Sequence, residues 1–269
     1  MLRLWTCAMA AAAVLAAPAM AGEPMVTGVA IYEIGLDPSG KGGGLASIAG
    51  SMRAKVEHIC GAYVTDAELD AELAGPDGGR MPLNVVSHHR ESAEDLAFEV
   101  RTRLANMEVD AAAGTAVRED EGLAVALDEP KPGTVMLPGK VMFPMAMLEA
   151  AIAAAQEGRR FVQFRTFDGT GGGAEVWTVS VVITPVDGAA DEDEAMFVDS
   201  LGFGDMAHWR MAFAYFPPGA AAGEQTPAFS TRMVVYENGF AQAAVYDLGQ
   251  FAMKLTLTEF QPIPPKPCP

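Results

Sequence analysis

The side chains that could do chemistry are few and scattered. Two of the four histidines, His58 and His208, are isolated, and the other two, His88 and His89, are adjacent. Adjacent residues of a strand point to opposite faces of a sheet, so His88 and His89 cannot hold one ion together. The sequence has no His-Glu-x-x-His, Walker or Gly-x-Ser-x-Gly motif. We therefore predict no catalytic residue, no metal site and no cofactor.

Carboxylates are abundant, with 35 Asp and Glu residues. With so many, some pair will meet by chance, and proximity alone does not identify a glycosidase. The acidic run at 191–194 is expected to be a solvated loop between strands, because its spacing does not match a calcium-binding EF-hand loop. An exported hydrolase that acts on an envelope polymer stays open as the alternative function. It would need an acid–base pair in a cleft.

Composition and charge exclude other classes of protein. The chain has 269 residues, half of them apolar, which is typical of a folded domain. Its 18 Lys and Arg residues leave a net charge of −17. Nucleic-acid binding requires a basic surface that replaces the counterions of the phosphates, and polybasic contact with a membrane requires one too. We expect neither.

The N-terminus has the three parts of a secretory signal peptide. A short cationic start at Arg3 precedes an apolar stretch at 4–17 and an Ala-x-Ala site that ends at Ala21. The apolar stretch is short for a bilayer span, which needs about 20 residues. We predict that residues 1–21 are cleaved and that residues 22–269 form a single exported domain with no transmembrane segment. A retained membrane anchor is the alternative.

Cleavage at that site would leave two cysteines, Cys60 and Cys268. An even number of cysteines in an oxidising compartment favours a disulfide. Two free thiols or a thiol–metal pair are the alternatives. The proline-rich tail at 261–269 is expected to be an extended strap, held by such a bond. It should not be a central strand, because proline has no N–H to donate to a ladder.

Alternation of apolar and polar residues predicts many short strands. Such alternation occurs at 52–57, 98–104, 161–166, 177–181, 208–215, 233–236 and 251–259. Turn sequences separate these segments; Asn238-Gly239 predicts a type I′ hairpin, and the glycines from Gly169 to Gly173 predict another connection. Strands at this spacing are typical of an antiparallel sandwich, barrel or wrapped sheet.

One segment has the period of a helix. Met145, Leu148 and Ile152 lie on one helical face, Pro144 suits the first turn, and Gly158 suits a left-handed C-terminal cap. We expect this helix to lie across the sheet or to plug one of its openings. Core packing is the simpler role for its apolar face. The lining of an adaptable apolar groove by Met145, Leu148 and Ile152 is the alternative.

Three stretches form an ordered set that ends at Cys268. They are AIYEI at 30–34 with AGSM at 49–52 and Cys60, then VMLPGKVMFP at 135–144, then VQFRTFDG at 162–169. In this order they resemble the EipB family of periplasmic cell-envelope integrity proteins, over nearly the whole mature chain. The sequence departs from the family after Cys60, where it has Gly61-Ala62-Tyr63 in place of Asp-Gly-Trp.

The resemblance implies a mainly-β fold, in which a long antiparallel sheet winds into an open-barrel spiral with one main α-helix. It also implies periplasmic localisation, a disulfide between Cys60 and Cys268, and a functional link to a periplasmic tetratricopeptide-repeat protein. It implies no catalytic residues. We expect a non-enzymatic protein that binds a protein partner, a peptide or a lipid in the concave face of the sheet. A spacer with a filled interior is a further alternative.

Overall fold

The structure is a computed structural model that describes residues 25–38, 40, 44–186, 192–219, 226–264 and 268. The predicted signal peptide and residues 265–267 and 269 of the tail lie outside the described residues. The strands are β1 (Gly28–Leu36), β2 (Ser47–Ile59), β3 (Ala62–Ala74), β4 (Arg80–Glu91), β5 (Asp95–Leu104), β6 (Met107–Glu119), β7 (Gly122–Glu129), β8 (Gly133–Pro138), β9 (Phe161–Thr166), β10 (Trp177–Pro185), β11 (His208–Phe216), β12 (Phe229–Tyr236), β13 (Ala241–Asp247) and β14 (Ala252–Pro262). The helices are α1 (Pro144–Gln156) and α2 (Glu192–Ser200).

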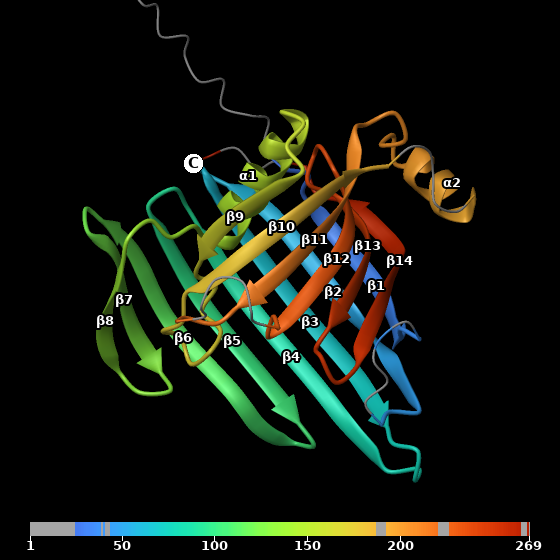
Figure 1. Cartoon of the computed structure of the whole chain (residues 1–269), viewed down its shortest axis with the longest axis horizontal. Coiled ribbons are helices and arrows are strands. Elements are labelled where there is room, and N and C mark those ends of the chain that lie inside the picture. Colours follow the sequence, from blue (N-terminus) through green and yellow to red (C-terminus); the bar gives the residue numbers. More distant parts are fainter. Residues whose placement is uncertain are drawn as a thin grey trace, which may run out of the picture.

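The strands form one antiparallel sheet of 14 strands in the order β8 to β1 and then β14 to β9. Strands that are adjacent in sequence are therefore paired, except β8 and β9, and β1 also pairs with β14. In Figure 1, β9–β12 cross in front of β2–β5, so the sheet folds over on itself. This arrangement confirms the predicted mainly-β fold with a wound, open sheet.

The two edges of the sheet, β8 and β9, are not neighbours in the ladder. The chain that follows β8 nevertheless reaches the end of β9. Met142 donates its backbone N–H to the carbonyl of Arg165 at 2.8 Å, and its own carbonyl accepts the N–H of Phe167 at 2.9 Å. These bonds hold the sheet together at one end.

The folded sheet has a buried inner face and an exposed outer face, and its core is divided into clusters. The first cluster packs α1 against the inner face of β9–β12 and includes Trp177, Met211 and Phe213. The second lies under β5–β8 and includes Phe143 and Phe167. The third joins β1–β4 to β13 and β14. The core is therefore several clusters around the inside of a wound sheet.

The predicted helix is confirmed as α1. Pro144 stands in its first turn, and it ends before Gly158, which has the left-handed φ of 78° that the prediction required. The N–H of Gly158 donates to the carbonyl of Ala155 at 2.9 Å. α1 packs against the inner face of the sheet through Met147, Ala151 and Ile152.

The acidic run was wrongly predicted to be a loop, because α2 begins at Glu192. The apolar residues that follow the run explain the helix. Val198 is 2% exposed and packs in a fourth cluster with Tyr236 and Phe240. Burial of this side chain provides the tertiary contact that a short helix requires.

Six of the seven predicted strand segments lie within strands of the sheet, and the seventh, 251–259, lies in β14 except for Phe251, which precedes it. Two details differ from the expectations. Gly239 has a φ of 82° but Asn238 is not left-handed, so the β12–β13 hairpin does not contain a type I′ turn. Pro262, expected in a strap outside the sheet, ends β14 opposite Gly28. Proline is tolerated there because the pairing of β13 with β14 ends at Thr256. Beyond that residue, one edge of β14 has no partner strand that would require a backbone N–H.

Candidate functional site

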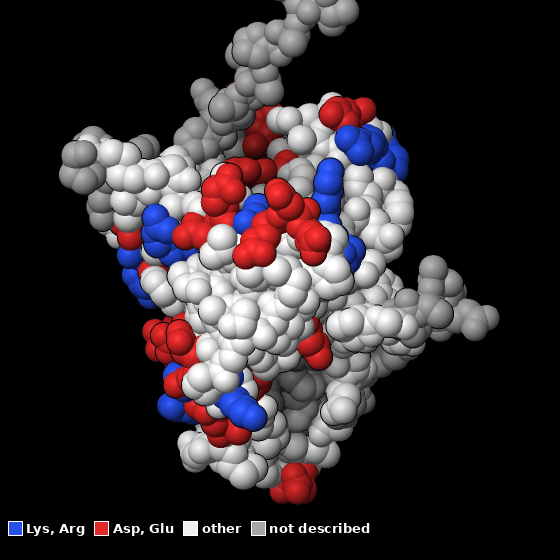
Figure 2. All heavy atoms as spheres, turned by 90° about the vertical axis from the view of Figure 1, so that its left-hand side faces the viewer, with Lys and Arg blue, Asp and Glu red and all other residues white. Residues whose placement is uncertain are grey.

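The space between the core clusters is lined by side chains that are only partly buried. Met52 on β2, Leu69 on β3, Val85 on β4 and Met233 on β12 all face inward and keep intermediate exposure. Their intermediate exposure indicates that the layers do not fully cover these inward-facing side chains. Figure 2 shows a recess in the lower half of the surface on the side of β7 and β8. We call the inner space between these clusters the hollow.

Three tyrosines from three strands lie at the hollow. The hydroxyl of Tyr32 on β1 donates to the carbonyl of Ala241 at 2.9 Å. Tyr215 on β11 and Tyr246 on β13 have no hydrogen-bond partner for their hydroxyls among the described residues. Burial raises the pKa of all three phenols, and the neighbouring Tyr246 raises the pKa of the other two further. All three phenols therefore stay neutral at ordinary pH.

The two hydroxyls without partners are surrounded by protein but keep some accessible surface. No polar side-chain atom of the described residues is both fully buried and without a partner. Tyr215 and Tyr246 keep intermediate exposure and point to the same face as the buried residues of β11 and β13, so their hydroxyls are on the side of the hollow. Enclosed polar groups normally have hydrogen-bond partners. Two tyrosine hydroxyls without such partners, both facing an inner space, therefore indicate a place where a molecule could bind.

Aromatic rings hold Tyr215 in position. Its ring stacks on Phe229 with the centroids 4.2 Å apart, and Trp177 meets both rings edge-on. The indole N–H of Trp177 donates to Thr170 Oγ1 at 3.0 Å, and Thr170 Oγ1 donates to Asp168 Oδ1 at 2.6 Å. Asp168 is also close enough to raise the pKa of Tyr215. One wall of the hollow is therefore a rigid, acidic and aromatic corner.

The glycine-rich connection after Asp168 allows this corner to form. Gly169 has a φ of 80°, and a Cβ on it would lie 2.4 Å from the ring of Phe98. A Cβ on Gly173 would lie 2.5 Å from Leu127. Glycine adopts this positive φ without strain, and its lack of a Cβ leaves room for Phe98 on β5 and Leu127 on β7. The segment can therefore pack closely against these two strands. The predicted connection between strands is confirmed, between β9 and β10.

The histidines are not brought together. His88 Nδ1 pairs with Asp66 at 2.5 Å on the outer face, whereas His89 Nε2 lies 3.0 Å from the carbonyl of Asp168 on the inner face. The predicted opposite orientation of this pair is confirmed. His58 contacts the ring of Tyr63, and His208 stacks on Tyr236. No group of three metal-binding side chains occurs among the residues that the structure describes.

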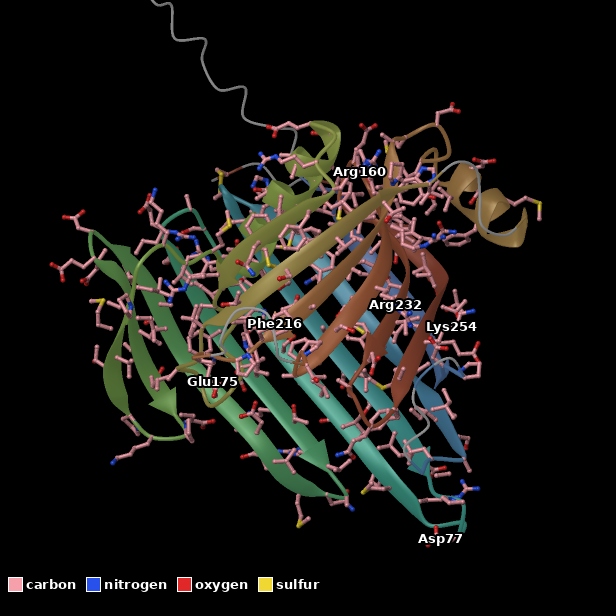
Figure 3. All side chains as sticks on the ribbon, in the orientation of Figure 1. Asp77, Arg160, Glu175, Phe216, Arg232 and Lys254 are labelled. Carbon is pink, nitrogen blue, oxygen red and sulfur yellow. A yellow bond between two sulfur atoms is a disulfide. The ribbon has the colours of Figure 1, made fainter. Side chains whose placement is uncertain are left out.

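Positive charge is kept away from the hollow. Of the Lys and Arg residues on the described strands, Arg118 alone shares the face of the buried side chains, opposite Leu123. Its guanidinium donates to the carbonyls of Ala93 and Val141 and lies over the ring of Phe143. Figure 3 shows Arg232 and Lys254 on the front layer, where register places both on the outer face.

The chain matches a known protein family over most of its length. Residues 19–264 match the family model described as EipB-like. The chain belongs to the EipB-like family. The cell envelope integrity protein EipB of Brucella abortus (strain 2308) is 26% identical over 245 residues, which cover 89% of this chain and 85% of that protein.

A solved structure shares the EipB-like fold. The crystal structure of a β-barrel-like protein of domain of unknown function DUF1849, from Brucella abortus, has a TM-score of 0.79 and 24% identity, and the match covers 90% of this chain and 99% of that one. At this identity the likeness shows the fold. The EipB relative is named for envelope integrity, and neither of these two relatives is named as an enzyme. Within the described residues, no helix has the length and apolar character needed to cross a bilayer.

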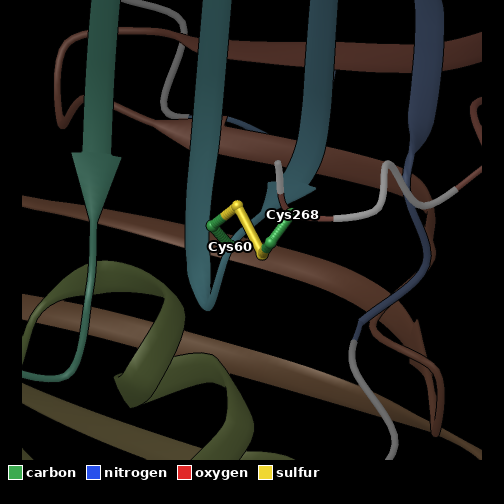
Figure 4. Close-up of a disulfide and its surroundings, with 2 residues drawn as sticks. All are labelled: Cys60 and Cys268. Carbon is green, nitrogen blue, oxygen red and sulfur yellow. A yellow bond between two sulfur atoms is a disulfide. The ribbon is translucent and has the colours of Figure 1, made fainter.

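The disulfide expected for an EipB-like protein is present. Cys60 and Cys268 are bonded, with their Cα atoms 5.1 Å apart (Figure 4). Cys60 and Gly61 form the two-residue turn between β2 and β3, with φ angles of 52° and 77°. The bond therefore attaches the end of the chain to a tight hairpin.

Tyr63, which follows the turn at Cys60 and Gly61, ties three segments together. Its hydroxyl accepts the backbone N–H of Met25 at 3.0 Å and donates to Glu149 Oε1 on α1 at 2.8 Å. A tryptophan indole could donate but could not accept in this way. If the family has tryptophan here, as the resemblance implies, Tyr63 makes a contact in this chain that the tryptophan could not make.

The three residues predicted as an alternative groove lining lie on α1. Ile152 is buried in the first cluster, and Met145 and Leu148 pack against it while partly buried. The same cluster includes Trp177 and Tyr215 at the hollow. Sequence reasoning missed these aromatic residues. The alternation pattern could have identified Tyr215, because it points to the same face of β11 as Trp209, Met211 and Phe213.

Proposed function

We propose that this EipB-like protein is a non-enzymatic periplasmic protein that supports envelope integrity by binding an apolar or acyl ligand in the hollow. The observation that carries the proposal is the pair of unpaired tyrosine hydroxyls at an inner space with apolar walls. Ligand sites are mostly apolar and contain a few polar groups that orient the ligand. The proposal includes cleavage of residues 1–21, and mass spectrometry of the exported protein should give Gly22 as the first residue.

The inward-facing acids and bases support a binding role over hydrolysis. Glu91 is occupied by two backbone N–H groups of α1, and His89 Nε2 lies against the carbonyl of Asp168. Burial lowers the pKa of His89, with Asp168 opposing the shift, so this ring carries no charge at neutral pH. A hydrolase would require a free acid–base pair at the cleft.

Binding of the uncharged fluorescent probe N-phenyl-1-naphthylamine to the mature oxidised protein tests the proposal. We expect saturable binding that Ala67→Phe weakens at least fivefold, because Ala67 faces inward on β3 and a larger side chain would fill the space. Ser51→Phe on the exposed outer face of β2 is the matched control and should bind normally. Absence of saturable binding, or equal loss in both variants, would contradict the proposal.

A periplasmic tetratricopeptide-repeat protein is the partner that the family resemblance implies, and it stays part of the proposal. Cross-linking of the exported protein in cells, followed by mass spectrometry, would test it. Recovery of such a repeat protein with the wild-type chain would support the link. Its absence from the cross-linked material, while acyl ligands are recovered, would leave lipid binding as the function.

A further inference from the structure

The polar groups at the hollow are neutral or acidic. Register places Tyr246 opposite Thr231, and Thr231 opposite Phe213, two residues before Tyr215 on the same face. Asp168 is connected to Tyr215 through two side chains: its Oδ1 accepts from Thr170, whose Oγ1 accepts the indole N–H of Trp177, and the Trp177 ring meets that of Tyr215 edge-on. The polar corner of the hollow therefore offers phenol hydroxyls beside a carboxylate.

No positive charge balances this carboxylate at the hollow within the described part of the chain. The Lys and Arg side chains of the strands point outward, and Arg118, which points inward, is engaged at the end near α1 by the carbonyls of Ala93 and Val141. The described Lys and Arg residues outside the strands, on the loops, are exposed.

This distribution of charge selects among amphipathic ligands. A ligand carboxylate or phosphate would lose its hydration here, would meet the negative charge of Asp168, and would find no cation. An ester, amide or hydroxyl group has no such penalty. Phenol hydroxyls can donate to its carbonyl oxygen or accept from its O–H or N–H.

We propose that the hollow binds an acyl chain whose polar end is an uncharged ester, amide or hydroxyl group, seated at the Tyr215 and Tyr246 hydroxyls, and that it discriminates against chains ending in a carboxylate or phosphate. The apolar side chains of the hollow, such as Leu69, Val85 and Met233, contact the chain itself. This inference rests on the proposed function and specifies its ligand.

Two ligands with the same twelve-carbon chain test the inference: 1-monolauroylglycerol, which is uncharged, and laurate at pH 8, which is anionic. Binding is followed by calorimetry and by tryptophan fluorescence, to which Trp177, whose ring contacts Tyr215, contributes together with Trp209. We expect monolauroylglycerol to bind at least tenfold more tightly. Tyr215→Phe and Tyr246→Phe should each weaken its binding about threefold to tenfold, the loss expected for one hydrogen bond, and leave laurate unaffected.

Tyr63→Phe is the matched control, because its hydroxyl is already paired with Glu149 and Met25. It should keep the wild-type preference, and circular dichroism would verify folding of all variants. Equal or tighter binding of laurate would overturn the inference and leave the proposed function standing. Unchanged binding in both Phe variants would overturn the role of the two hydroxyls. Failure of both ligands to bind would overturn the proposed function together with the inference.

Discussion

At the scale of single residues, Glu91 supplies a helix cap from a distant strand. α1 has Phe143 at its N-cap position, with no side-chain cap and no acidic residue in its first turn. Glu91 on β4 compensates, since Oε2 accepts the N–H of Met145 and Oε1 accepts that of Ala146, each at 2.8 Å. A carboxylate at a helix N-terminus also interacts favourably with the helix dipole.

We predict that Glu91→Ala lowers the free energy of unfolding by about 1–3 kcal/mol, because it leaves two partly buried N–H groups without acceptors. Urea denaturation would measure the change. Glu157→Ala is the control: this exposed residue at the other end of α1 pairs with Arg159 only in a surface ion pair, so its loss should cost less than about 1 kcal/mol. Equal effects of the two substitutions would rule out the cap.

The same carboxyl predicts how stability depends on pH. Burial raises the pKa of Glu91 from 4.5 to about 7, although the two N–H groups oppose the shift. Between these values the folded protein holds a proton that the unfolded chain releases. Stability from this group is therefore greatest below pH 4.5 and falls as the pH rises through 7. The total change is at most about 3 kcal/mol.

Urea midpoints at pH 5, 6, 7 and 8 would measure this dependence. Glu91→Gln cannot titrate, so the difference in unfolding free energy between wild type and variant should move in favour of the variant as the pH rises. A constant difference across this range would show that Glu91 titrates normally.

Some contacts between individual residues could be predicted from the sequence, and others could not. The Cys60–Cys268 bond was predictable because only these cysteines remain after the expected cleavage. The cap of α1 by Glu91 was not predictable. Helix caps usually come from the residue just before the helix, whereas Glu91 lies 54 positions before Met145. The tyrosines of the hollow were also missed, because their meeting depends on how the sheet winds.

At the scale of elements, two strand glycines differ in what surrounds them. A Cβ on Gly50 of β2 would lie 2.1 Å from the carbonyl oxygen of Asp70 and 2.6 Å from the Cα of Ala71. A Cβ on Gly35 of β1 would meet nothing within 4 Å. Gly50 therefore permits β2 and β3 to approach closely, while Gly35 has no such role.

We predict that Gly50→Ala destabilises the protein by about 1–3 kcal/mol, since the β2–β3 ladder must shift to admit the methyl group. Gly35→Ala is the matched control. It should be neutral or raise stability by up to about 1 kcal/mol, because alanine restricts the unfolded chain. Thermal unfolding would distinguish the two, and similar midpoints would show that β3 accommodates the methyl group.

The elements themselves were largely predictable where one face is buried. Segments such as 98–104 and 251–259 alternate because β5 and β14 each place one face against the core. α2 was missed, because its acidic start indicates a solvated loop and its stabilising contact through Val198 is tertiary. The β12–β13 turn was located correctly, but its type depends on the φ of Asn238, which the dipeptide alone does not determine.

At the scale of the whole molecule, the disulfide closes a loop between residues 208 positions apart. In the chain-entropy model, such a loop stabilises the folded state by up to about 5 kcal/mol. We predict that Cys268→Ser lowers the unfolding midpoint and increases protease sensitivity in oxidising buffer. Cys60→Ser and the double variant should lose the same amount, because each breaks the same bond. An unchanged melting curve would falsify the prediction.

The winding of the sheet could not be derived from the alternation of apolar and polar residues. This pattern shows which side chains share one face of a strand, but not which strands pair with each other. A sandwich, a barrel and a wrapped sheet all fit the strand pattern. The family resemblance implied the open spiral, and the structure confirms it through the ladder order. What decides the winding is the pairing of β1 with β14, which lie more than 200 positions apart in sequence and whose contact no local pattern signals.

That pairing has a consequence for how the protein is made. Until β14 is available to pair, β1–β8 and β9–β13 are two unconnected meanders, and β1 has one bare edge. Assembly must wait for one of the last segments of the chain to emerge, and until then the bare edge of β1 is open to edge-to-edge aggregation. A circular permutant that begins at β9 and ends at β8, with Pro262 linked to the neighbouring Gly28, would remove this delay by making every strand pair local.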